Sequence, residues 1–143
     1  MATLTVANSV FTLSCPDLDI APVQIQGFAT DDAFDTTAVK PVETIIGVDG
    51  RMSKGFVAFT VPFKFMLQAD SPSILIMDAI QEAQEIKQEA FTLYASIVAP
   101  GLGKLWTFSN GGLTGYKKTP QAKKLMGPLD YEITWEKVIS AVA

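Results

Sequence analysis

Apolar and polar residues alternate over positions 63–69, and a helical pattern follows directly. Phe63, Phe65 and Leu67 point to one side of an extended chain while Lys64 points to the other, which is the period of a half-buried strand. This strand-to-helix junction lies near the middle of the chain, and the other elements are expected to pack around it.

A single substantial helix is predicted over about 72–90. Ser71 can cap its free backbone N–H groups, Pro72 suits the first helical position, and Asp70 lies at the positive end of the helix dipole. The residues expected to pack on the sheet recur every three or four positions: Ile76, Ala79, Ile80, Ala83, Ile86 and Ala90. Lys87 interrupts this stripe near the helix end, where its aliphatic stem can cover apolar surface.

Shorter alternating runs predict strands at 2–14, 23–27, 42–48, 56–61, 91–97, 104–109, 113–116 and 129–136. Asp49-Gly50 favours a tight hairpin, and Asn110-Gly111-Gly112 is interpreted as a second turn. The pattern as a whole predicts a mainly β (α+β) protein of one domain over residues 1–143. Its expected form is an antiparallel β-sandwich or partly closed barrel with one flanking α-helix.

The last predicted strand has two clearly separated faces. Its apolar face holds Leu129, Tyr131, Ile133 and Trp135, and its polar face holds Asp130, Glu132, Thr134 and Glu136. Because the apolar face must be buried, the polar face has to meet water or a polar partner. Gln24 and Gln26 form a similar polar face on a strand that is expected to be its neighbour.

Two segments have both a routine and a functional interpretation. Residues 30–41 show no periodic element and carry an exposed-looking aromatic, Phe34, so they are either a surface loop or a contact segment. The predicted helix carries a row of acids opposite its apolar stripe: Asp78, Glu82, Glu85 and Glu89. Acids four residues apart repel by roughly 0.2–0.5 kcal/mol per pair, so the row is either a solvated face or a face for a basic partner.

Composition argues against catalysis and against ligand binding at a metal or cofactor. The chain has no histidine and one cysteine, Cys15, which is interpreted as a buried hydrophobe. The glycine-rich run 110–115 lacks the Gly-Lys-Ser/Thr ending of a phosphate loop. A net charge of −4 disfavours a nucleic-acid reader, which needs a basic surface. Neither an enzymatic activity, a metal nor a cofactor is therefore expected.

The high content of hydrophobic residues predicts extensive burial of apolar surface. Hydrophobic residues make up 48% of the chain, which fits either a well-filled core or burial against other chains. No apolar run approaches the ~20 residues that a membrane helix needs. The first residues show no secretory signal pattern.

Several segments in combination resemble tail tube proteins of tailed bacteriophages. They are Thr30-Asp31-Asp32-Ala33-Phe34-Asp35, Gly47-Val48-Asp49-Gly50-Arg51-Met52-Ser53, Leu67-Gln68-Ala69-Asp70-Ser71-Pro72-Ser73 and Tyr131-Glu132-Ile133-Thr134-Trp135-Glu136. The resemblance covers roughly residues 27–138, and the segment 67–73 is its most specific part.

The resemblance implies a structural virion protein of the phage tail, assembled in the cytoplasm of the host bacterium. Its fold would be similar to other tail tubes and to the type VI secretion tube, with hexameric rings stacked around a channel for DNA ejection. The implied partners are sheath, baseplate and tail terminator proteins, and DNA would pass without specific binding. Two alternatives stay open: the tube of a phage-derived bacteriocin or secretion system, and a small ligand-binding β-barrel of the lipocalin type.

Within the tube interpretation, three groups of residues are candidates for assembly. Contacts between rings are assigned to Phe34, Asp35, Arg51 and Met52. Lumen-facing positions are assigned to Asp130, Glu132, Thr134 and Glu136, with Gln24 and Gln26 as weaker members. Contact with a sheath or a neighbouring copy is assigned to Asp78, Glu82, Glu85 and Glu89, with Lys117 and Lys118 of the basic loop 117–128 as possible partners in an adjacent copy.

Overall fold

The computed structural model describes residues 9–26, 34–119, 122 and 124–142. The strands are β1 (Val10–Cys15), β2 (Ile20–Gln24), β3 (Phe34–Thr36), β4 (Val42–Ile46), β5 (Met52–Phe56), β6 (Val61–Leu67), β7 (Leu93–Ala99), β8 (Lys104–Tyr116) and β9 (Leu129–Val142). One α-helix, α1, spans Ile74–Lys87, and short 3₁₀ turns occur at Pro16–Leu18 and Pro100–Leu102. The prediction of a mainly β fold with one helix is confirmed. Strands were predicted over 2–14, and the part of this range before residue 9 lies outside the described residues. Lys123 and residues 30–33 also lie outside them.

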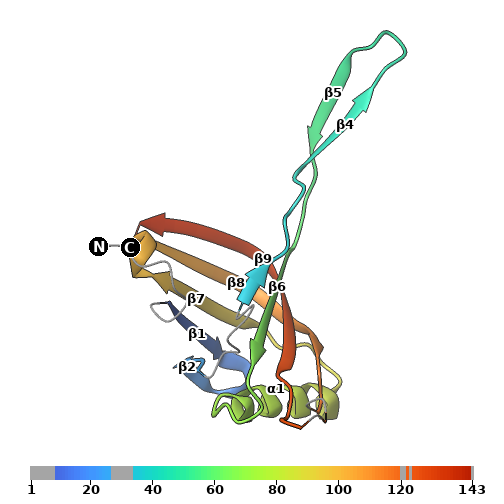
Figure 1. Cartoon of the computed structure of the whole chain (residues 1–143). Helices are drawn as coiled ribbons and strands as arrows, with labels where there is room; N and C mark the ends of the chain where they lie inside the picture. Colours follow the sequence, from blue (N-terminus) through green and yellow to red (C-terminus); the bar gives the residue numbers. More distant parts are fainter. Residues whose placement is uncertain (1–8, 27–33, 120–121, 123, 143) are drawn as a thin grey trace.

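Seven strands form one antiparallel sheet in the order β2-β1-β7-β8-β9-β6-β3, and β4 and β5 pair separately (Figure 1). The large sheet is strongly curved, and its two ends approach each other. The ring centroids of Phe11 on β1 and Phe63 on β6 lie 5.4 Å apart, although β7, β8 and β9 separate these strands along the sheet. The sheet thus encloses an aromatic core on its concave side without closing into a barrel.

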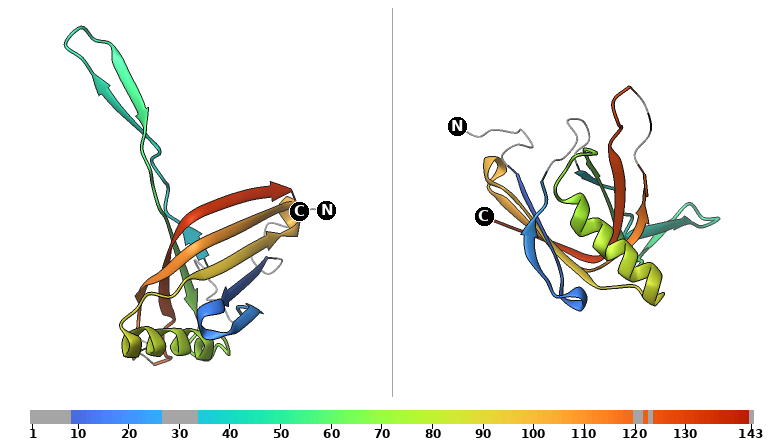
Figure 2. Two further views of the ribbon diagram at one scale, coloured as in Figure 1. Left: turned by 180° about the vertical axis from the view of Figure 1, so that it is seen from behind. Right: turned by 90° about the horizontal axis from the view of Figure 1, so that it is seen from below.

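Helix α1 packs across one end of the curved sheet (Figure 2). It begins two residues later than expected, at Ile74, and the Ser71 hydroxyl accepts a hydrogen bond from the Ser73 N–H at 3.2 Å. It ends at Lys87 because Gln88 adopts a left-handed conformation with φ of 53°. The Lys87 ammonium lies 5.7 Å from the centre of the Phe91 ring, which is within the range of a cation–π contact.

The predicted apolar stripe of the helix is wrong in part. The buried helix residues are Met77, Ile80 and Gln81, whereas Ile86 is 82% exposed. Ala90 follows the end of the helix. The buried face is thus turned toward Met77 and Gln81. This leaves Ile86 on the outer side.

The predicted turn at Asn110-Gly111-Gly112 is also wrong, because β8 runs without a break from Lys104 to Tyr116. Asn110 has a φ of 51°, and the pairing of β7 with β8 shifts between Leu93 and Ala95. The left-handed residue is thus a bulge inside a strand. Gly111 pairs with Trp135 of β9, and the indole lies directly over it.

Phe34 belongs to the core rather than to an exposed loop. It lies in β3, pairs with Phe65 of β6, and its ring stacks on those of Phe63 and Phe11 at centroid distances of 6.1 Å and 6.4 Å. The expectation that 30–41 contains no regular element is therefore wrong for residues 34–36. A Phe34→Ser variant would remove aromatic packing, so it cannot report on contacts between rings alone.

Residues 37–60 form a projecting arm (Figures 1 and 2). Strands β4 and β5 pair from Val42–Phe56 to Ile46–Met52 around the Asp49-Gly50 turn, where Gly50 has a φ of 81°. The turn was predicted correctly, but the return strand begins at Met52 rather than at 56. We call residues 37–60 the arm below.

Raising the pH above about 10 is expected to destabilise the fold through Tyr131. Burial raises the pKa of this phenol to about 12, with a smaller contribution from Asp78, whereas Gln81 acts in the opposite direction. In the unfolded chain the phenol ionises near its ordinary value, so unfolding releases a proton and stability is lost as the pH rises between 10 and 12. The loss should be on the order of 2 kcal/mol.

Denaturant unfolding at about pH 9 and about pH 11.5 measures this dependence. Tyr131→Phe should remove most of the difference between the two conditions. Tyr94→Phe is the control, because Tyr94 is exposed and its removal should leave the difference as it is. An equal loss of stability in the wild type and in Tyr131→Phe would contradict the assignment.

Among the described residues, no helix has the length and apolar character needed to cross a membrane.

Candidate functional site

The arm carries an apolar face that no described residue of its own chain covers. The cross-strand pairs Val42–Phe56, Thr44–Lys54 and Ile46–Met52 lie on one face because side chains alternate along a strand. Val42, Ile46, Met52 and Phe56 are all at least half exposed, and Phe56 reaches 76%. We call these four residues the apolar arm face. A two-stranded hairpin with an unburied apolar face is marginal in water, so this face is a candidate contact surface.

The sequence-based candidates near this arm divide into two kinds. Met52 belongs to the apolar arm face, and Arg51 is exposed next to the hairpin turn, where its N–H donates to the Asp49 carboxylate at 3.1 Å. Asp35 is exposed on β3, next to the buried core, rather than on the arm. Sequence reasoning missed Ile46 and Phe56 as surface residues. Counting alternate positions outward from the hairpin turn would have placed both residues on one face of the hairpin.

The outer face of β9 carries a ladder of polar side chains. Asp130, Glu132, Thr134 and Glu136 all point away from the core, as the alternation predicted. Glu132 pairs across the sheet with Lys64, and Lys64 pairs with Asp35 on the other side. Thr134 and Thr114 hydroxyls lie 3.1 Å apart, and the Asn110 amide donates to the Glu136 carboxylate. We call this surface the polar ladder.

Gln24 and Gln26 are exposed, but they are not next to the polar ladder. Strand β2 lies at one edge of the sheet, with β1, β7 and β8 between it and β9. The expectation of neighbouring strands is therefore wrong. The residue that lies next to Glu132 in the polar ladder is Lys64. Lys64 was not assigned to a site from the sequence, because its position depends on the strand register.

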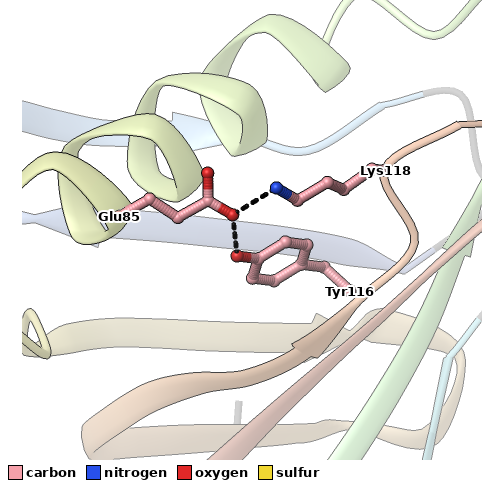
Figure 3. Close-up of polar contacts among 3 residues, drawn as sticks. All are labelled: Glu85, Tyr116 and Lys118. Atoms are coloured by element: carbon pink, nitrogen blue, oxygen red, sulfur yellow. Dashed lines mark hydrogen bonds and ion pairs between the residues drawn. The ribbon is translucent and has the colours of Figure 1, made fainter. Parts of the chain in front are cut away.

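Glu85 on the outer side of α1 is already engaged within its own chain. Its carboxylate accepts a hydrogen bond from the Tyr116 hydroxyl at 2.6 Å and forms an ion pair with the Lys118 ammonium at 2.6 Å (Figure 3). These contacts lower the pKa of Glu85 and raise those of Lys118 and Tyr116. Together they fasten the segment after β8 to the helix.

This geometry changes the interpretation of the acidic row. The expected partner for Glu85, Lys118, comes from the same chain rather than from an adjacent copy. Asp78 is half-buried, Glu82 is exposed on the helix, and Glu89 is exposed but lies beyond the helix end. Lys117 is exposed, and its N–H donates to the Asp130 carbonyl at 3.1 Å.

A sequence profile of the family described as tail fiber protein gp32 matches residues 2–139. No curated protein has a sequence that matches the chain significantly.

The fold is similar to chains of three solved assemblies. A chain of the PVC sheath-tube complex, an extracellular contractile injection system in its extended state, has a TM-score of 0.66 at 11% identity, covering 99% of this chain and 93% of that one. The tube-terminating cap of the anti-feeding prophage gives 0.61 at 16% identity, covering 100% and 93%. A chain of the 6-fold symmetrised baseplate of that prophage gives 0.58 at 11% identity, covering 99% and 98%. At these identities the similarity shows a shared fold.

Proposed function

The chain belongs to the family described as tail fiber protein gp32, and from this premise we propose that its copies form stacked hexameric rings of a tail tube. The observation that carries the proposal is the apolar arm face, which projects from the body and has no cover in the described chain. The fold shared with the sheath-tube complex supports a tube. The 6-fold symmetry of the similar baseplate supports six copies in a ring. The role is structural rather than catalytic.

A phage tail is the first setting, in which the tube conducts DNA from the virion into the host. The fold similarity to an extracellular contractile injection system and to an anti-feeding prophage favours a second setting, the tube of a phage-derived bacteriocin or injection system. In both, the partners would be a sheath, a baseplate and a terminator of the tube. Both settings require the same assembly of rings.

Purified protein tests the assembly directly. Light scattering should show particles far larger than one chain, and negative-stain electron microscopy should show hollow tubes with stacked rings. Filaments without a channel would favour a tail fibre, which the family description names. Monomers at all concentrations and salt conditions would contradict the proposal.

We further propose that the polar ladder faces the channel. Its carboxylates repel nucleic-acid phosphates, and Lys64 between Asp35 and Glu132 limits that repulsion. Such a lining lets DNA pass without being held.

Replacing Glu132 with Lys is expected to make the tubes retain DNA. The change places two lysines side by side on β6 and β9 and turns the centre of the ladder basic. Tubes incubated with short duplex DNA at low salt should then retain it after sedimentation and release it as the salt rises. Glu82→Lys is the control, because it makes the same charge change on the exposed side of α1. Equal retention by both variants would show that the ladder is not the channel wall.

We propose that the acidic side chains of the row other than Glu85 contact a sheath protein. Replacing Glu82 and Glu89 with Gln is expected to leave bare tubes intact and to reduce sheath assembly around them. The effect per contact is small, since an exposed ion pair contributes only ~0–1 kcal/mol, but it recurs in every subunit. Co-assembly with the sheath protein, scored by electron microscopy at two salt concentrations, measures it. Loss of bare tubes would instead assign these acids to contacts between copies of the chain.

A further inference from the structure

The far half of β9 has a backbone edge that is open on one side. Strand β6 pairs with β9 from Leu129 to Trp135, and β6 begins there, at Val61. Strand β9 continues to Val142, paired over residues 136–142 only with β8. Within the part of the chain that the structure describes, no strand pairs with the other edge of this half. Such an edge is a ready template for an added strand.

An apolar hollow lies beside this edge. It is lined mainly by Phe34, Val61, Phe63, Trp106, Phe108 and Val138. Val138 belongs to both features, because it lines the hollow and lies in the open half of β9. Helix α1 contributes no residue to the lining.

Each of these features matches one feature of the arm. Strands β4 and β5 pair only with each other among the described strands, so each has an outer edge of unpaired backbone groups. The apolar arm face offers Val42, Ile46, Met52 and Phe56 without a surface to cover. The arm projects away from the curved sheet (Figures 1 and 2). None of its residues lines the hollow of its own chain.

We propose that the hollow and residues 136–142 of β9 form the docking site for the arm of a second copy. One arm strand adds to the open edge of β9, and the apolar arm face covers the hollow. The inference rests on the proposed ring assembly and names the surface that receives the arm. Backbone hydrogen bonds along the edge would fix its register, and burial of the four arm side chains would stabilise the contact.

Intermolecular disulfides test the docking. Ser140 is exposed on the open half of β9, on the same face as Val138. On the arm, Thr44 and Lys54 pair with each other midway between the four residues of the apolar arm face and lie on the same side of the hairpin. Ser140→Cys protein is mixed with Thr44→Cys or with Lys54→Cys protein under reducing conditions, assembled and then oxidised. An affinity tag on one variant identifies mixed dimers. Cys15 is fully buried and does not compete.

The expected result is a mixed disulfide dimer as the main product with one of the two arm variants. Ile139→Cys, which lies on the opposite face of the same strand, should give little of it. Tubes without any mixed dimer to Ser140→Cys, or with arm-to-arm dimers alone, would overturn the docking site and leave the proposed function standing. Failure of the wild-type protein to form tubes would overturn the proposed function, and this inference with it.

Discussion

Replacing Ile46 with Asp is expected to weaken assembly strongly, whereas the same replacement at Ile45 should leave tubes largely intact. The two residues are adjacent on β4, chemically identical and equally exposed, at 72% and 73%. They differ in the face they occupy. Ile46 pairs with Met52 on the apolar arm face, while Ile45 pairs with Ser53 on the other face.

The size of the effect follows from burial. Covering an isoleucine side chain contributes about 1.5–3 kcal/mol, and a buried unpaired carboxylate adds a further penalty. Because about 1.4 kcal/mol corresponds to a tenfold change in an equilibrium constant, the critical concentration for assembly should rise at least about tenfold.

Sedimentation of tubes over a concentration series measures that threshold. Circular dichroism provides the folding control, since both side chains lie on the projecting arm and neither belongs to the core. A loss of assembly that is equal in both variants would show that partners cover both arm faces. Unchanged assembly in Ile46→Asp would remove the arm from the contacts.

Replacing Gly111 with Ala is expected to destabilise the body severely, while Gly112→Ala should be nearly neutral. A Cβ atom on Gly111 would lie 2.2 Å from Cε3 of Trp135, a contact that requires the ring to move. Trp135 is fully buried and packs against Phe108 at a centroid distance of 5.3 Å, so moving the ring would disturb the packing of the core. A Cβ atom on Gly112 meets nothing within 4 Å.

The expected cost at Gly111 is about 3 kcal/mol or more, at the upper end for overpacked cores. At Gly112 it is within about 0.5 kcal/mol, as for an ordinary surface change. Urea unfolding monitored by circular dichroism measures both values. Gly111→Ala with Trp135→Leu is a useful second variant, because a smaller side chain should restore part of the loss. Equal stability of the two single variants would mean that the indole does not depend on Gly111.

Elements with a regular alternation could be predicted well from the sequence. The faces of 129–136 are as expected because one side is wholly buried and the other is polar. The Asp49-Gly50 turn follows from local backbone preference, and Gly50 has the positive φ that this turn requires. In these cases the determining physics lies within a few residues of the chain.

The errors arose where distant residues decide the local structure. Asn110-Gly111-Gly112 has the composition of a turn, but Trp135 lies over Gly111 and the strand continues. Phe34 follows an acidic segment, yet its ring packs against those of Phe63 and Phe11 at the core. The ion pair between Glu85 and Lys118 likewise joins a helix to a segment far along the chain. Strand order and register are needed to see such contacts.

The strand order of the seven-stranded sheet also determines when the aromatic core can form during synthesis of the chain. Among the described strands, β9 alone joins β8 to β6, and it follows both of them in the sequence. The aromatic rings on β6 and β1 meet across the curved sheet, so their packing depends on a strand made after both of them. A chain emerging from the ribosome therefore carries an unfinished core until β9 is available. Folding of the seven-stranded sheet is thus a late event governed by long-range pairing, and all residues of the projecting arm have been synthesised before it begins.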